Sequence, residues 1–142
     1  MRENNSAVIL AALLMLIGPA AIADEQRAKA NYMLNCQGCH TADGSGHQGR
    51  NIPTLKNYMG KFPKVEGGRE FLIQVPGASQ ALLSSEQLAE LTNWMLREFD
   101  PKSLKDNFIP YQTQEVHQLR QHKVIDFTPV RNALVKKIEL LP

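Results

Sequence analysis

The stretch "NYMLNCQGCHTADGSG", residues 31–46, contains the motif that decides the fold. Its centre, "CQGCH", runs from Cys36 to His40 and includes the only two cysteines of the chain. Two thiols separated by two residues and followed at once by an imidazole must act with each other or with a group that the sequence does not encode. Four interpretations fit this spacing: a disulfide, a thioredoxin-type redox pair, a zinc site and covalent haem attachment.

The surroundings of the motif favour haem attachment. A redox Cys-x-x-Cys normally follows a strand, whereas "DEQRAKANYMLNC", residues 24–36, has helix formers and apolar residues at helical spacing. A structural zinc site needs four ligands, and this motif offers three crowded ones. Cys-x-x-Cys-His is the signature of covalent haem attachment. We therefore predict one haem c, bonded through thioethers to Cys36 and Cys39 and ligated on its proximal side by His40.

Residues 1–23 have the pattern of a secretory signal peptide. "MRENNS" supplies one arginine, an uncharged apolar run follows, and "AIA" gives a small-residue cleavage pattern before Asp24. The apolar run from Ala7 to Gly18 is shorter than the roughly 20 residues that a membrane-spanning helix needs. We expect cleavage near Asp24, export to a bacterial periplasm or an equivalent space, and no membrane span afterwards.

Size and charge set further limits. The chain after cleavage has about 119 residues, which suits one domain. The net charge of the whole chain is +2, and no basic stripe with interleaved aromatic residues indicates nucleic-acid binding. No acid–base pair or nucleophile arrangement indicates an enzyme. We expect a haem domain over residues 24–99 and a C-terminal helical extension over residues 100–142.

From Glu25 to Phe99 the chain resembles the class I c-type cytochromes. An aromatic residue, Tyr32, lies four positions before the first motif cysteine, and Pro53 follows the motif in "NIPTL". The stretch "SSEQLAELTNWMLREF", residues 84–99, matches the last helix of that family and carries Trp94. The resemblance implies an all-α fold of three core helices around one covalent haem.

The resemblance also implies roles for several residues. The carbonyl of Pro53 would accept the Nδ1–H of His40 and so orient the ligand. Leu55 would pack on the macrocycle, and Tyr32 and Trp94 would pack on the haem or in the core where the first and last helices cross.

Two local features complete the haem domain. Gly44 and Gly46 suit a tight loop that brings the chain close to the porphyrin edge. Ser84 or Ser85 is a suitable cap for the last helix, with Glu86 and Gln87 in its first turn.

The distal iron ligand departs from the family pattern. Class I cytochromes usually supply a methionine from the loop before the last helix, often followed by proline. Here that loop, residues 69–87, contains no methionine, and Val75 precedes Pro76. Met59 is the first alternative, because Gly60 and nearby lysines predict a flexible loop that could turn over the distal face. An open or water-bound iron is favoured equally with Met59, and Met95 ranks below both. The other candidate ligands are His117 and His122, and then Met33 and His47.

The C-terminal extension is predicted to form two short amphipathic helices. The first would be capped by Thr113, with Glu115 in its first turn. The second would have Thr128 as its N-cap and Pro129 as its first residue. Its apolar face would comprise Val130, Leu134, Ile138 and Leu141. These apolar faces must pack on the domain, which we favour, or on a partner protein.

Basic residues dominate the region between residues 50 and 69, where Glu66 is the only acid opposing Arg50, Lys56, Lys61, Lys64 and Arg69. In the family this region lies near the exposed haem edge, where charge steers transient encounters. We expect an acidic redox partner to dock there.

The sequence favours a soluble periplasmic electron carrier between a dehydrogenase or quinol oxidoreductase and a downstream acceptor. One alternative is a haem c protein that binds a diatomic gas such as CO or NO at an open or weakly ligated iron, as one half of a heterodimer. Another is a haem subunit of a larger respiratory complex, held through the C-terminal helices.

Overall fold

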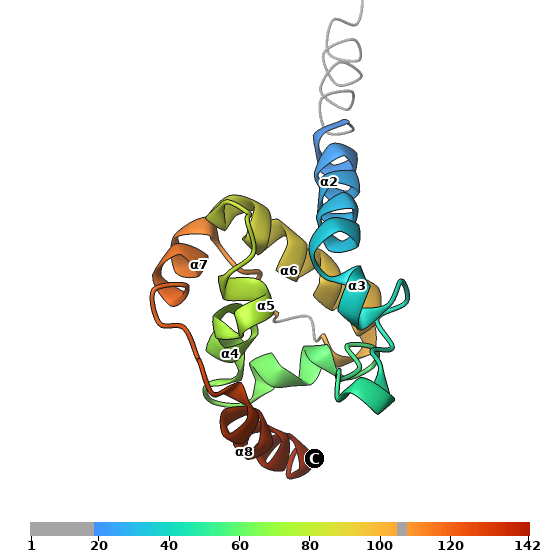
Figure 1. Cartoon of the computed structure of the whole chain (residues 1–142). Coiled ribbons are helices and arrows are strands. Elements are labelled where there is room, and N and C mark those ends of the chain that lie inside the picture. The colour runs from blue at the N-terminus through green and yellow to red at the C-terminus, as the bar shows by residue number, and fades with distance from the viewer. Residues whose placement is uncertain (1–18, 105–107) are drawn as a thin grey trace, which may run out of the picture.

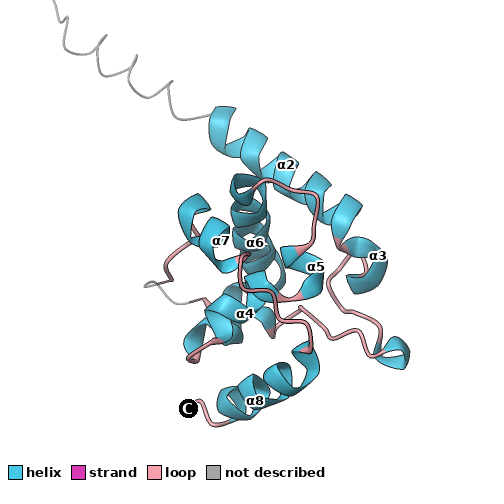
Figure 2. Cartoon of the chain, turned by 60° about the vertical axis from the view of Figure 1, so that its left-hand side comes forward, coloured by secondary structure: helices cyan, strands magenta, loops and turns pink. Residues whose placement is uncertain are grey.

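The computed structural model describes residues 19–104 and 108–142, which form helices joined by loops (Figures 1 and 2). The all-α prediction is confirmed, and the only β pairing in these ranges is the isolated bridge between His47 and Ile52. The α-helices are α2 (Pro19–Asn35), α3 (Gln37–His40), α4 (Gly68–Gln74), α5 (Pro76–Ser79), α6 (Ser85–Phe99), α7 (Thr113–Leu119) and α8 (Phe127–Glu139). The 3-10 helices are η1 (Gln48–Arg50), η2 (Met59–Lys64) and η3 (Pro101–Ser103).

Helices α2 and α6 pack on each other through an aromatic cluster. The Tyr32 ring centroid lies 5.5 Å from that of Trp94 and 4.9 Å from that of Phe99. Such pairs contribute about 0.5–1.5 kcal/mol each beyond the area they bury. Burial raises the pKa of Tyr32 to about 12, so its hydroxyl stays protonated and donates a hydrogen bond of 2.6 Å to the carbonyl of Thr41. Tyr32 therefore ties the α2–α6 core to the loop that follows α3.

Helix α6 begins at a capping box. The first backbone N–H groups of a helix have no partner within it, and the capping box supplies two hydrogen bonds there. The Ser84 hydroxyl accepts from the Gln87 N–H at 3.1 Å, and the Gln87 side chain accepts from the Ser84 N–H at 2.9 Å. Ser84 is one of the two predicted caps. Nearly every α6 residue from Leu88 to Leu96 is buried, because α2, α7, η2 and η3 pack around this helix.

The first part of the extension is fastened to α4 and α6 by polar contacts. The Asn93 amide donates to the Tyr111 carbonyl at 2.9 Å and accepts from the Tyr111 N–H at 2.8 Å. Arg69 of α4 makes a two-point ion pair with Glu115 at 2.5 and 2.8 Å. Its guanidinium also lies 4.0 Å from the centre of the Tyr111 ring. Val116 of α7 is fully buried against the core.

Helix α8 packs at the end of the molecule away from the first turns of α2 (Figures 1 and 2). Its buried residues, Leu134 and Ile138, lie in a cluster with Phe62 of η2 and Phe71 of α4. The rings of Phe62 and Phe71 stack 5.5 Å apart. Of the predicted apolar face of α8, Leu134 and Ile138 are therefore buried within the chain and Leu141 is half-buried, whereas Val130 is exposed, so the prediction was wrong for Val130.

The predicted starts of both extension helices were wrong. Thr113 is the first helical residue of α7, and the N-cap is Gln112, whose N–H donates to the Glu115 carboxylate at 3.4 Å. Helix α8 begins at Phe127 after the N-cap Asp126, two residues earlier than expected. Proline is tolerated in a first helical turn, where its missing N–H has no partner to lose, so Pro129 does not mark the first residue.

The predicted signal peptide lies largely outside the described residues. Helix α2 begins at Pro19 and continues through the expected cleavage point before Asp24. Among the helices that the structure describes, none combines the length and the apolar character that crossing a membrane requires.

Candidate cofactor site

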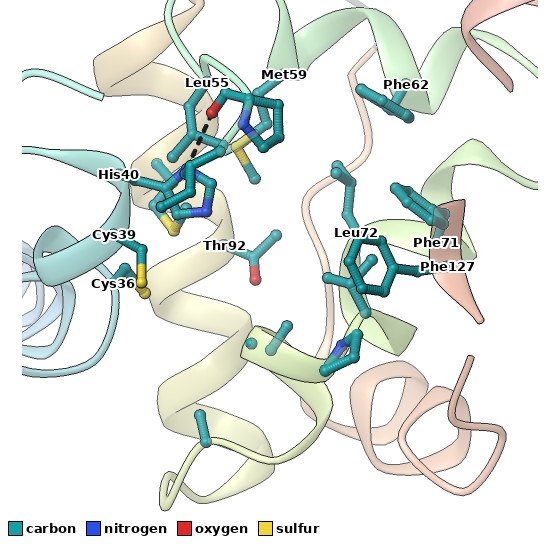
Figure 3. A pocket seen from close by; sticks show the side chains of 18 of the residues that line it. Cys36, Cys39, His40, Leu55, Met59, Phe62, Phe71, Leu72, Thr92 and Phe127 are labelled. Carbon is teal, nitrogen blue, oxygen red and sulfur yellow. Dashed lines mark hydrogen bonds between the residues drawn. The ribbon is translucent and has the colours of Figure 1, made fainter. Parts of the chain in front are cut away.

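A cavity of about 360 Å³ lies between the Cys36–His40 motif and the start of α8 (Figure 3). This volume falls in the range of small-molecule and cofactor pockets. Its lining is predominantly apolar and comes from α3, residues 51–55, η2, α4, α5, α6 and the start of α8.

Both motif cysteines face this cavity. Backbone hydrogen bonds to the Cys36 carbonyl from the N–H groups of Cys39 (3.1 Å) and His40 (2.9 Å) wind the motif into a helical turn. This turn places both thiols on the cavity wall, where they are not bonded to each other. Cys36 is half-buried and Cys39 is exposed. Burial, followed by the effect of Cys39, raises the pKa of Cys36 to about 11.

His40 is held in one orientation by Pro53. Its Nδ1 lies 3.1 Å from the Pro53 carbonyl oxygen, the contact drawn as a dashed line in Figure 3. Because a carbonyl only accepts, Nδ1 carries the proton and Nε2 keeps its lone pair for a metal. Burial lowers the pKa of His40, while the bond to Pro53 opposes this shift. The imidazole is therefore held neutral and oriented, as iron ligation requires.

The glycine loop serves the His40–Pro53 contact. Gly46 has a φ of 72°, and its N–H donates to the His40 carbonyl at 3.0 Å. A Cβ at this position would lie 2.5 Å from the Pro53 carbonyl oxygen. Gly44 packs in the same way under the Phe99 ring, where a Cβ would lie 2.7 Å from the ring. Both glycines therefore allow close approaches within the chain, at Pro53 and Phe99, and the expected approach of this loop to the porphyrin edge stays a prediction.

Met59 lies on the wall that carries Pro53 and Leu55. Leu55 lines the cavity, and the Met59 N–H donates to its carbonyl at 2.9 Å. Figure 3 shows Met59 beside Leu55, toward the His40 end of the cavity, and its side chain is buried. The prediction of a flexible loop here was wrong. Residues 59–64 form η2, and the Gly60 N–H is held by the buried Asp100 carboxylate at 2.9 Å.

Two further walls come from α4–α5 and α6. The first contributes Leu72, Val75 and Pro76, and in its described stretch it offers the cavity no methionine or histidine. The second contributes residues at helical spacing, namely Leu88, Leu91, Thr92 and Met95.

Several predicted residues lie away from the cavity lining. Tyr32 and Trp94 belong to the core between α2 and α6. The less favoured iron ligands are all exposed and are not among the lining residues: Met33, His47, His117 and His122.

The sequence analysis missed the contribution of the extension. Phe127 and Arg131, on successive turns of α8, line the cavity. Arg120, just after α7, donates to three backbone carbonyls of the loop before α6: Ser79 (3.3 Å), Ala81 (2.8 Å) and Leu83 (2.7 Å). No sequence signal shows such bonds, because the acceptors are main-chain atoms that every residue carries.

The donor set fits a covalently bound porphyrin. Two unpaired thiols and one oriented imidazole lie at one end of an apolar cavity, which suits thioether bonds and a single axial ligand. A redox Cys-x-x-Cys after a strand is not found, since Cys36 follows helix α2. Within residues 19–104 and 108–142, no group of three or more His, Cys, Asp or Glu side chains is arranged to hold a metal ion directly. Fold and site together define a haem protein of the c type.

Comparison with family models also indicates a c-type cytochrome. The model of the Cytochrome c family matches residues 25–97, just over half of the chain. The chain belongs to the cytochrome c family, whose members bind haem c covalently and transfer electrons. Comparisons with curated proteins and with solved structures gave no match.

The Gly46 contact predicts a matched pair of outcomes. Gly46→Ala should displace the Pro53 carbonyl and lower the free energy of unfolding by about 1–3 kcal/mol, the usual cost of a residue held in a disfavoured backbone region. Gly49→Ala is the control, because a Cβ there meets nothing closer than 3.9 Å. Denaturant unfolding of both holoproteins measures the difference. Equal stabilities would contradict the role assigned to Gly46.

The Arg120 contacts predict a second pair. Arg120→Met keeps much of the aliphatic stem but removes every hydrogen bond to the loop, so unfolding should become easier by about 1–3 kcal/mol. Lys123→Met removes an exposed charge nearby and should change stability by less than about 0.5 kcal/mol. Hydrogen exchange at residues 80–84 should accelerate only in the Arg120 variant. Unchanged exchange would show that the loop is held by other contacts.

Proposed function

We propose that the protein is an exported, periplasmic monohaem cytochrome c that carries electrons between a dehydrogenase or quinol oxidoreductase and a downstream acceptor. The observation that carries this proposal is the His40–Pro53 bond at the wall of an apolar cavity. This bond supports His40 as a proximal iron ligand with a fixed orientation, and the apolar lining supports a site of low polarity. Exposed Cys39 supports a haem edge that reaches the surface, where an electron can leave.

The haem supplies one-electron chemistry between the ferric and ferrous states. The residues of the chain set the conditions for this exchange. Pro53 keeps His40 in one tautomer, and Leu55, Leu72 and the α6 residues exclude water. A dry, rigid surrounding favours rapid transfer with little rearrangement and tunes the reduction potential. On this proposal the chain performs electron transfer rather than catalysis of its own.

The sixth iron ligand is part of the proposal. Apart from the motif cysteines, the sulfur atoms in the described cavity lining belong to Met59 and Met95. A thioether from either would close the iron and raise its potential. Met59 comes from the wall of Leu55, and Met95 comes from α6.

Addition of CO to the dithionite-reduced holoprotein tests this closure. A carrier with a bound thioether should keep its visible spectrum unchanged, because CO finds no vacant position. The single variants Met59→Ala and Met95→Ala then identify the ligand as the one whose loss allows CO to bind. Met33→Ala, an exposed methionine near the motif, is the control. Prompt CO binding by the unaltered protein would contradict a closed iron.

A gas-binding haem protein, as one half of a heterodimer, is the second candidate. The observation that favours it is the α4–α5 wall, where Val75, Pro76 and neighbouring apolar residues provide no iron ligand. An apolar pocket of this kind suits CO or NO, which need few hydrogen bonds.

The third candidate, a subunit held in a respiratory complex through the C-terminal helices, has less support. Val116, Leu134 and Ile138 are buried within the chain, so a partner would have to bind through the exposed apolar residues that remain on the extension, namely Ile109, Ile125, Val130 and Leu140.

An acidic redox partner is proposed to dock near the basic region, in a narrower form than the sequence suggested. Arg69 points inward to Glu115, so it is not part of an exposed docking surface. Lys56 lies 3.2 Å from Asp43, and Lys61 lies over the Tyr58 ring. The exposed charges that best support docking are Arg50 and Lys64.

Electron-transfer kinetics test this docking surface. The second-order rate with an acidic partner should fall as ionic strength rises, because salt screens exposed charges. The double variant Arg50→Glu/Lys64→Glu should lower the rate at low salt by about tenfold or more. Lys136→Glu, on α8, is the control and should have a smaller effect. Rates that ignore both salt and charge reversal would rule out the surface.

A further inference from the structure

Arg131 places a positive charge in the wall of the apolar cavity. The side chain is half-buried, and none of the salt bridges or side-chain hydrogen bonds found among the described residues involves it. Other arginines that lie against the domain are paired: Arg27 with Glu90, Arg69 with Glu115, and Arg120 with loop carbonyls. Arg131 differs from them in facing a cavity instead of a partner.

A guanidinium that is partly withdrawn from water at the wall of an apolar cavity is stabilised by an anion placed beside it. The other titratable groups in the described lining are Cys36, Cys39 and His40, and none of these supplies a carboxylate. Within the cavity, the partner for Arg131 would therefore be an anionic group of the molecule that fills it. A carboxylate suits this position best, because arginine binds carboxylates with two parallel hydrogen bonds.

The direction of the haem follows from its attachment. In a porphyrin of the b and c types, the two rings that carry the vinyl groups form one half of the macrocycle, and the two rings that carry the propionates form the other. A haem bonded to Cys36 and Cys39 therefore carries its carboxylates away from these cysteines. Figure 3 shows Phe127 across the cavity from both cysteines. Arg131 follows Phe127 by one helical turn and lines the same cavity.

We propose that Arg131 binds a haem propionate and that α8 thereby completes the cofactor site. The assignment lies outside residues 25–97, the part matched by the family model, and gives the C-terminal extension a direct role toward the cofactor. It rests on covalent haem attachment and not on whether the protein is an electron carrier.

A paired propionate affects the iron. An ionised carboxylate near the iron stabilises the ferric state, and a guanidinium beside the carboxylate offsets that negative charge. Loss of Arg131 should therefore lower the reduction potential. It should also change the propionate bending mode in the resonance Raman spectrum, because that mode responds to hydrogen bonding of the carboxylate. A side chain with a purely structural role would not move this mode.

The experiment compares three variants of the holoprotein with the parent. Arg131→Gln should lower the potential measured by spectroelectrochemistry with small mediators, and it should shift the propionate mode. Arg131→Lys keeps the charge but loses the two-point contact, so the mode should shift while the potential stays near that of the parent. Lys136→Gln removes an exposed charge from the same helix and should change neither. Far-ultraviolet circular dichroism verifies that each variant is folded.

The contrary results are distinct. If Arg131→Gln resembles Lys136→Gln in both potential and propionate mode, the assignment is wrong. It is also wrong if the Lys variant leaves the mode unchanged. If Arg131→Gln weakens azide binding to the ferric protein without moving the mode, the guanidinium serves an anion on the iron instead. Small mediators need no protein partner, so failure of the carrier proposal would leave these results intact.

Discussion

The hydrogen bond between His40 Nδ1 and the Pro53 carbonyl is the contact on which the rest of the site depends. It links the motif turn to the loop of residues 41–55, and that loop can close only because Gly46 lets the chain approach Pro53 without a side chain. Tyr32 supports the same loop from the α2–α6 core through its bond to Thr41. The helix crossing and the orientation of one imidazole are therefore parts of a single packing arrangement.

The other walls are built by different means. The α6 wall arises from helical periodicity, which sends Leu88, Leu91 and Met95 to one face. The α4–α5 wall is a short, apolar segment whose following loop is held by Arg120. The extension, through Phe127 and Arg131, completes the enclosure. Residues beyond the matched family region thus contribute directly to the cavity.

The sequence predicted those features whose chemistry is local. The Cys-x-x-Cys-His spacing and the Ser84–Gln87 capping box both act within one or two turns, so the motif turn and the start of α6 were found. Features that depend on distant packing were missed. The Gly60–Asp100 bond holds η2 where a mobile loop was expected, and α8 begins at Phe127, two residues before the start that Thr128 and Pro129 indicated. The Arg120 contacts reach main-chain oxygens, which leave no trace in the residue pattern.

The attachment of the loop by Arg120 has a consequence for the entry of small molecules. Where a loop itself supplies the iron ligand, an incoming molecule must break the bond to the iron, and the loop moves when that bond is lost. Here residues 79–83 are held by Arg120, a side chain that is not among those lining the cavity. The wall can keep its shape whatever occupies the sixth position. The entry of a small molecule then depends on the width of the cavity opening and on the ligand that it replaces at the iron. The loop of residues 79–83 does not have to refold.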